Sequence, residues 1–289
     1  MDSFHTDGGL RVPAVTAQQM REVDRVAVQE IGPNLHQMME NAGRNLASVC
    51  RTMLGERWTT MPVVVVAGPG GNGGGGICAA RHLANHGADV TVVVSDSRRL
   101  ADVPAQQLAL YRATNGLIVD PRDLSSLKPA LTVDALLGYS LAGAPRGVVA
   151  DLIGWMSKAP APVVALDVPS GVDASTGEAP ASHVRATTTV TLALPKTGLH
   201  VDAVGELWVA DIGIPRGVFE RAGVECPPAG LFSQGYTVRV TPTLKGASAE
   251  RVPPERRRRS GGTMSDSSLN SQIRAPERPE GRDRSSRSG

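Results

Sequence analysis

The chain has little of what several classes of protein require. Phe, Trp and Tyr make up only 3% of the 289 residues, so stacking platforms for single-stranded nucleic acid are nearly absent. The three cysteines, Cys50, Cys78 and Cys226, are odd in number and far apart, which excludes a disulfide framework. The longest apolar runs are far too short to cross a bilayer. The first residues contain no apolar signal-peptide core, so we expect a cytoplasmic protein without a membrane partner.

Positive charge is concentrated near one end of the chain. Residues 245–289 hold eleven Lys and Arg against six Asp and Glu, whereas the formal net charge of the whole chain is only +2. Because this segment has almost no large apolar residues, we predict a disordered basic tail. Its run Arg256–Arg259 could contact RNA or an acidic surface, and a solvated tail without a specific partner is the plainer alternative. The remainder has no basic field, so we do not expect a nucleic-acid partner.

The order of apolar patterns favours an α/β fold. Apolar residues recur at helical spacing from Thr16, the expected N-cap, to Ile31, and a second helix is expected over about 35–54. Continuous Val-rich runs, which are typical of strands covered on both faces, then alternate with helical segments. This alternation predicts a three-layer α/β/α sandwich around a Rossmann-like, doubly wound, mostly parallel sheet. The further predicted strands lie within 61–68, 89–96, 131–138, 162–171, 186–196 and 205–215, and the further helices within 77–87, 104–114 and 147–158.

A glycine-rich stretch follows the first predicted strand. Seven of the nine residues from Gly68 to Gly76 are glycine. Without side chains, backbone N–H groups can approach an anion, which the positive end of the next helix also attracts. We therefore predict a turn that holds a phosphate-bearing ligand, and a flexible turn without a ligand is the alternative. Pro69 and Asn72 crowd the formal G-x-G-x-x-G match, which argues against an ordinary dinucleotide oxidoreductase.

Three more segments place polar residues at the ends of predicted strands, where parallel sheets bind ligands. Asp134 lies near the end of an apolar strand, where it meets a cation or hydrogen-bond donors, or else caps the next turn. Asp167 is well placed for acid–base chemistry, and Ser170 offers an oxygen that suits a hard cation. Lys196 pairs either a phosphate or Asp167, or is an ordinary exposed lysine.

Five motifs in this order give the chain a family resemblance. They are MENAGR at 39–44, GPG-x-NGG-x-G at 68–76, VDALLG at 133–138, D-x-PSG-x-D at 167–173 and a late PK at 195–196. Together they resemble the NAD(P)H-hydrate epimerase family, also called the YjeF N-terminal domain, over roughly residues 11–225. The resemblance implies an isomerase that interconverts the R and S epimers of hydrated NADH and NADPH in metabolite repair, which a separate NAD(P)H-hydrate dehydratase completes. It also implies bound potassium (K+) and, in many members, a homodimer.

The same resemblance implies particular site residues. It puts the K+ ligands at Asn72, Asp134 and Ser170, together with backbone carbonyl groups. As a hypothesis, we assign catalysis to Asp167 with Lys196: the carboxyl protonates the leaving hydroxyl while a ring iminium forms, then activates water for the other face. The expected substrate-binding residues are Gly71, Asn72, Gly73, Gly74, Gly75, Gly138, Tyr139, Ser140, Leu141, Ala142, Gly143, Ala144 and Asp167.

Two positions depart from the family pattern. The family loop usually has Asn and Asp where this chain has Gly71 and Gly75. Losing that Asp removes a carboxylate from the substrate loop, so the alternative to an active epimerase is a catalytically weakened nucleotide-binding or regulatory module on the same fold. An NAD-dependent dehydrogenase is disfavoured, because the chain has neither a substrate domain nor a convincing His or Tyr to handle a hydride.

Overall fold

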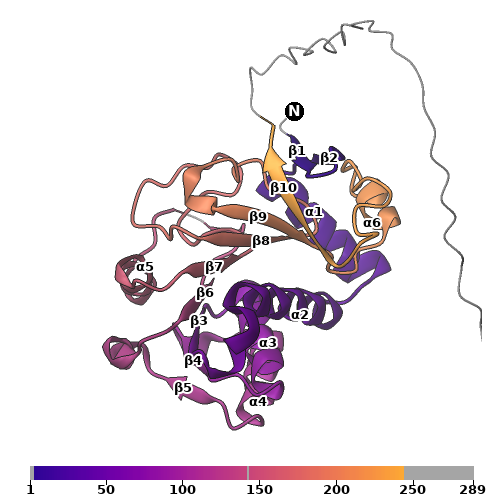
Figure 1. Ribbon diagram of the computed structural model, residues 1–289. Helices are drawn as coiled ribbons and strands as arrows, with labels where there is room; N and C mark the ends of the chain where they lie inside the picture. Colours follow the sequence, from indigo (N-terminus) through magenta and orange to yellow (C-terminus); the bar gives the residue numbers. More distant parts are fainter. Residues whose placement is uncertain (1–2, 142, 244–289) are drawn as a thin grey trace, which may run out of the picture. The chain divides into compact units, whose positions relative to one another are not determined.

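A ten-stranded, mostly parallel sheet runs through the computed structural model, which describes residues 3–141 and 143–243 (Figure 1). The strand order is β2-β1-β10-β9-β8-β7-β6-β3-β4-β5. The seven strands from β9 to β5 in this order are parallel, and β10, β1 and β2 add an antiparallel edge. The strands are β1 (Ser3–Thr6), β2 (Arg11–Pro13), β3 (Val63–Ala67), β4 (Val90–Val94), β5 (Leu117–Val119), β6 (Leu131–Ala135), β7 (Val163–Leu166), β8 (Thr188–Leu192), β9 (Glu206–Ala210) and β10 (Thr237–Pro242).

Helices cover both faces of the sheet. One face packs against α2, α3 and α4, which Figure 1 shows grouped together, and the other packs against α5 beside β3 and β7. The helices α1 and α6 share a third apolar cluster with β9 and β10. This arrangement confirms the predicted α/β class. The α-helices are α1 (Ala17–Val26), α2 (Leu35–Leu54), α3 (Gly71–Asn85), α4 (Asp102–Arg112), α5 (Val148–Lys158) and α6 (Arg216–Arg221), and the shorter turns are η1 (Ala27–Ile31, a π-helix), η2 (Gly55–Thr60), η3 (Ser97–Arg99), η4 (Pro121–Ser126) and η5 (Asp202–Val204).

The chain enters its first two helices through matching caps. The Thr16 hydroxyl accepts a hydrogen bond from the Gln19 backbone N–H, and the Gln19 side-chain oxygen accepts one from the backbone N–H of Thr16. Asn34 and Gln37 repeat this capping box at the start of α2. Each box satisfies two N–H groups that a helix start otherwise leaves unpaired. The predicted N-cap at Thr16 and the predicted helix over 35–54 are thereby confirmed.

The glycine-rich stretch differs from the predicted turn. Helix α3 begins at Gly71, so most of these glycines lie in its first turns. A Cβ atom on Gly73 would lie 1.8 Å from the Gly68 carbonyl oxygen, and one on Gly76 would lie 2.4 Å from the Ala135 Cβ atom. These glycines are therefore needed because they let α3 pack directly against the end of β3 and against β6.

The sheet extends beyond the predicted domain limits of 11 and 225, since β1 precedes them and β10 follows them. All the described residues belong to one compact unit. The predicted basic tail at 245–289 lies outside the described residues. None of the helices in 3–141 and 143–243 combines the length and apolar character needed to span a membrane.

Candidate active site

The strands β3, β6, β7 and β8 bring the predicted polar residues together at their carboxyl ends. Asp134, at the end of β6, is fully buried. Its Oδ1 atom accepts hydrogen bonds from Ser170 Oγ at 2.6 Å and Leu136 N at 3.2 Å, and its Oδ2 atom accepts one from Ser170 N at 2.7 Å. Burial raises the pKa of Asp134 to about 6, against the opposing effect of these bonds. Asp134 thus meets hydrogen-bond donors and also caps the turn at Leu136.

Asn72, in the first turn of α3, lies next to Gly138. A Cβ atom on Gly138 would lie 3.4 Å from Asn72 Cγ and 3.2 Å from Asp167 Oδ2, so the chain must approach closely here. The Asn72 Nδ2 atom is buried and has no hydrogen-bond partner among the residues that the structure describes. A buried amide N–H group without a partner is uncommon, which marks this side chain as one that a hydrogen-bond acceptor on a ligand would satisfy.

Asp167 and Lys196 form a buried ion pair. The ammonium group of Lys196 donates hydrogen bonds to Asp167 Oδ1, to Thr191 Oγ1 at 3.2 Å and to the Leu192 carbonyl at 2.9 Å. Lys196 has no exposed surface, so the alternative of an ordinary exposed lysine is wrong, and its partner is Asp167. The second carboxylate oxygen of Asp167 accepts a hydrogen bond from the backbone N–H of Tyr139 at 3.1 Å.

The backbone of Asp167 is strained. Its φ angle is +68°, in the left-handed region that residues other than glycine seldom adopt. Such a conformation costs on the order of 1–3 kcal/mol and persists where the surrounding structure holds it in place. Here the Asp167 N–H donates a hydrogen bond to the Val190 carbonyl at 2.8 Å. The turn after β7 therefore fixes the direction in which the Asp167 side chain projects.

A cavity of about 250 Å³ opens beside this ion pair. Its polar lining comes from Asp24, Asn72, Tyr139, Asp167 and Lys196, and its apolar lining comes mainly from α1 and α2. An adjoining hollow of about 360 Å³ lies where α3 and α5 begin, and the two spaces share Gly71, Asn72, Gly138 and Ser140. Together they form a continuous site with a ring-sized apolar part and a more open part between two helix N-termini.

The predicted substrate-binding residues fall into three groups. Those that line the cavity or the hollow are Gly71, Asn72, Gly75, Gly138, Tyr139, Ser140, Leu141, Ala144 and Asp167. Gly73 and Gly74 are buried against Gly68 and Met39, and Gly143 is exposed, so these three line neither space. Ala142 lies outside the described residues.

The sequence patterns did not single out Asp24 as a site residue. It extends from α1 into the cavity, where its Oδ2 atom accepts a hydrogen bond from the Tyr139 hydroxyl at 2.5 Å. Met20 and Val28, four residues away on either side, line the same cavity. The available signal was a carboxylate on the apolar face of an amphipathic helix, where a charge is costly unless it has a partner.

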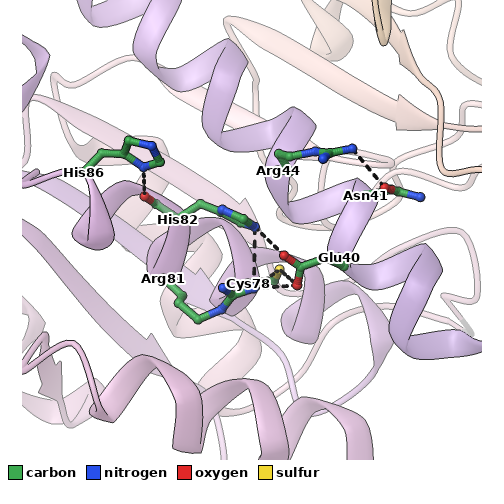
Figure 2. Close-up of polar contacts among 7 residues, drawn as sticks. All are labelled: Glu40, Asn41, Arg44, Cys78, Arg81, His82 and His86. Carbon is green, nitrogen blue, oxygen red and sulfur yellow. Dashed lines mark hydrogen bonds and ion pairs between the residues drawn. The ribbon is translucent and has the colours of Figure 1, made fainter.

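A second polar cluster joins α2 to α3 outside this cavity (Figure 2). Glu40, Cys78 and His82 offer one ligand atom each within 4.8 Å of one another, a set that could hold a metal ion. Arg81 Nη2 lies among them, 2.5 Å from Glu40 Oε2, 3.4 Å from Cys78 Sγ and 3.5 Å from His82 Nε2. The guanidinium therefore already fills the space between the donors and neutralises Glu40. This geometry makes the cluster an ion-pair network that ties the two helices together.

Protonation in this network follows from burial and from Arg81. Burial raises the pKa of Cys78 to about 12, and the charge of Glu40 adds to that effect, so the thiol stays protonated. Burial also lowers the pKa of His82, helped by the nearby charge of Arg81, which favours the neutral imidazole. On Glu40 the effect of burial is outweighed by Arg81, and the pKa is lowered. The network is held by one Arg–Glu ion pair, with a neutral thiol and imidazole beside it.

The fold and site define an α/β protein whose ligand site lies at the carboxyl edge of its parallel strands. Residues 35–198 match the family described as YjeF-related protein N-terminus. The chain is 50% identical over 238 residues to an NAD(P)H-hydrate epimerase of Dehalogenimonas lykanthroporepellens, covering 82% of this chain and 97% of that one. It is 38% identical over 230 residues to a bifunctional NAD(P)H-hydrate repair enzyme Nnr of Salinibacter ruber, covering 73% of this chain and 42% of that one.

A solved structure agrees with these sequence matches. The crystal structure of the yeast protein ynu0 superposes with a TM-score of 0.68 at 27% identity, covering 79% of this chain and 100% of that chain. The chain belongs to the YjeF-related N-terminal family. It spans nearly all of its single-function relative from Dehalogenimonas and about two fifths of the bifunctional relative from Salinibacter.

Proposed function

We propose that this chain is an NAD(P)H-hydrate epimerase, an isomerase that interconverts the R and S epimers of hydrated NADH and NADPH in nicotinamide-cofactor repair. The observation that carries the proposal is the Asp167–Lys196 pair, which lines a cavity beside Asn72 in a chain 50% identical to a protein of that name. We assign the activity to the domain predicted over 11–225, completed by the flanking strands β1 and β10.

The two connected spaces suit the two chemical parts of such a substrate. The cavity of about 250 Å³ has the apolar lining that a nicotinamide ring requires. The adjoining hollow lies at the N-termini of α3 and α5 and is lined by Arg146. Gly70 caps α3 without any side-chain bond, which leaves backbone N–H groups open to a phosphate. The pyrophosphate therefore lies in the hollow while the hydrated ring lies against Asp167.

Asp167 transfers a proton on at least one face of the reacting carbon. The hydroxyl of the hydrate stands on a carbon next to the ring nitrogen, whose lone pair can expel it. Loss of water gives a ring iminium, and addition of water to the opposite face gives the other epimer. Lys196 and the Tyr139 N–H hold the Asp167 carboxylate in one orientation in the cavity. A positioned carboxyl group of this kind contributes about 10²–10⁴-fold to rate.

The side chains proposed to hold K+ have the donor chemistry that this ion requires. Asp134 and Ser170, which are hydrogen-bonded to each other, and the side-chain carbonyl of Asn72 would supply oxygen atoms, the donor type that hard cations prefer. No ion pair from a described Lys, Arg or His neutralises the buried carboxyl of Asp134. K+ held by these side chains would supply that charge and would fix Asn72 at the start of α3, next to the substrate.

The protein works with a separate NAD(P)H-hydrate dehydratase. The bifunctional repair enzymes align with this chain over about two fifths of their length, so their other part has no counterpart in the matched region. We propose that the protein is cytoplasmic and that it forms a homodimer. Light scattering during size-exclusion chromatography would measure the dimer directly, and a monomeric mass would contradict it.

The decisive assay supplies a mixture of hydrated NADH epimers together with a dehydratase specific for the S form. The wild-type protein should accelerate loss of the R form, and more so in potassium than in sodium. Asp167→Asn should reduce this rate at least about 10²-fold. No acceleration at high enzyme concentration would instead support a nucleotide-binding or regulatory module.

Two substitutions test the departures from the family loop. A Cβ atom at Gly71 meets nothing within 4 Å, so Gly71→Asn is accommodated without movement. A Cβ atom at Gly75 would lie 2.8 Å from Leu166 Cδ2, so the Asp side chain in Gly75→Asp requires that flexible side chain to shift. Both positions line the cavity. If the missing carboxylate limits turnover, Gly75→Asp will raise the rate and Gly71→Asn, its matched control, will not.

A further inference from the structure

Asp24 and Asp167 contribute separate carboxyl groups to the same cavity. Asp24 comes from α1, between Met20 and Val28, whereas Asp167 follows β7 at the sheet edge. The Asp24 side chain is partly buried, and its Oδ2 atom accepts the Tyr139 hydroxyl at 2.5 Å. A carboxylate held this closely by a hydroxyl is arranged to exchange a proton with it.

Tyr139 connects the two carboxyl groups. Its backbone N–H donates to Asp167 at 3.1 Å, and its hydroxyl donates to Asp24. The Lys196 ammonium lies 5.9 Å from the centre of the Tyr139 ring. The two carboxyl groups therefore contact opposite ends of one tyrosine residue. Inverting glycosidases, which also add water to a carbon, use two carboxyl groups set far enough apart to admit the water.

The inversion itself requires proton transfer on two faces of the ring. A hydroxyl leaves one face with a proton from the protein, and a water that adds to the other face must lose a proton to the protein. A single carboxylate fixed at one wall of the cavity, as Asp167 is by Lys196, serves one face only. We propose that Tyr139, backed by Asp24, is the proton carrier for the second face; this rests on the proposed epimerase function.

The step balances in atoms and electrons. The C–O bond on one face breaks as its oxygen takes a proton from one carrier, and the nitrogen lone pair forms the C=N bond. Water then bonds to the carbon from the other face, and the C=N electron pair returns to nitrogen. The proton lost by that water passes to the second carrier. When Tyr139 is the acceptor, its own hydroxyl proton moves to Asp24; when it is the donor, the proton returns from Asp24.

Burial and the surrounding charges act on the protonation of both groups. Burial raises the pKa of Asp24, against the hydrogen bond from Tyr139 and the positive charge of Lys196. Burial also raises the pKa of Tyr139, and the negative charges of Asp24 and Asp167 reinforce this while Arg21 opposes it. Tyr139 is thus the catalytic residue of the pair, and Asp24 is a positioning residue that acts through it.

The test compares Asp24→Asn and Tyr139→Phe with wild type in the epimer assay. Both changes keep the size of the side chain. We expect kcat to fall about 10²-fold in each, with KM changed by less than about threefold, since the lost step is proton transfer. The double variant should be no slower than either single variant, because the two groups act as a unit. Asp24→Glu should retain more activity than Asp24→Asn, although it disturbs packing more.

A matched control variant and the wild-type activity distinguish failure of the proposed function from failure of this inference. Glu22→Gln, on the exposed side of the same helix, should leave kcat unchanged, and urea unfolding should show that every variant is folded. Wild-type protein without epimerase activity would overturn the proposed function and this inference together. If the wild-type protein is active, and both Asp24→Asn and Tyr139→Phe keep kcat within about twofold of its value, the inference alone would be overturned. A rise in KM at constant kcat would likewise overturn it, because it would indicate a role in binding only.

Discussion

Replacing Asp134 with Asn should remove a specific pH dependence of stability. Burial raises the pKa of Asp134 to about 6 in the folded chain, whereas an unfolded Asp titrates near 3.9. The folded state therefore holds this proton more tightly than the unfolded state. The resulting stability is fully present below about pH 4 and is lost as the pH rises through 6. The difference between the two pKa values corresponds to about 3 kcal/mol.

The assay is urea unfolding of the wild type and of Asp134→Asn between about pH 4.5 and pH 7.5, in a buffer without potassium. The quantity that matters is the wild-type free energy of unfolding minus that of the variant. It should fall by about 2 kcal/mol across this range, because most of the linked proton is released within it. Asn turns an N–H group toward Ser170 or Leu136, which adds a cost that does not vary with pH and leaves the slope unchanged.

Potassium provides the second arm of the same experiment. A cation bound at Asp134 and Ser170 favours the ionised carboxylate, so saturating K+ should lower the pKa of Asp134 and flatten the fall. Sodium at equal ionic strength is the control. A wild-type minus variant difference that stays flat without potassium would refute the buried-carboxyl argument, and equal curves in potassium and sodium would refute a K+ site.

Two other predictions concern packing and the ion pair, each measured as the free energy of unfolding in urea. Lys196→Met should destabilise the fold by about 3–5 kcal/mol, since it leaves Asp167 buried without its partner. Adding Asp167→Asn should recover part of this loss. A double variant whose loss of unfolding free energy equals the sum of the two single losses would contradict a coupled pair. Gly43→Ala should lower the free energy of unfolding by about 1–3 kcal/mol, because its Cβ atom would lie 2.5 Å from Cys78 Sγ. Gly154→Ala, in open space within α5, should instead raise it by about 0.5–1 kcal/mol. Equal effects of the two substitutions would contradict the close contact between α2 and α3.

The parts of the fold that the sequence predicted are those with a strong local pattern. Every residue of β3 and β4 is buried, and a valine-rich run without alternating charged residues is typical of a strand covered on both faces. Helix α2 has both a capping box and a long apolar stripe, and it spans the range of about 35–54 that the sequence predicts. The meeting of Asp134 with Ser170 and of Asp167 with Lys196 followed from topology, since parallel strands present their carboxyl ends at one edge.

The antiparallel edge had no comparable signal. Strand β1 pairs with β10 through partners such as Phe4 and Pro242, which lie at opposite ends of the described chain. Strand β1 has only four residues, and both β1 and β10 carry polar residues; β5, at the other edge of the sheet, has only three residues. Pairing between such distant, weakly patterned segments depends on the finished sheet and not on local preference.

The glycine-rich stretch serves two purposes that composition alone did not separate. A Cβ atom on Gly70 or Gly71 would meet nothing within 4 Å, and Gly71 lines both the cavity and the hollow. From Gly73 to Gly76 the same atom would collide with neighbouring backbone or side chains. The first glycines therefore leave room for a ligand, and the later ones bring α3 close to the sheet.

Asp24 shows why a search for polar residues at strand ends does not find site residues on the first helix. Its helix precedes every parallel strand, so the rule that ligands gather at carboxyl edges gives no reason to single it out. The alternative signal was energetic: a carboxyl group beside Val23 and Ala27 on the buried face of α1 needs a partner, and that partner, the Tyr139 hydroxyl, lies 115 residues away. A charged residue on the apolar face of a helix therefore deserves the same scrutiny as one at a strand end, because both must be compensated and a ligand site is one place where that happens.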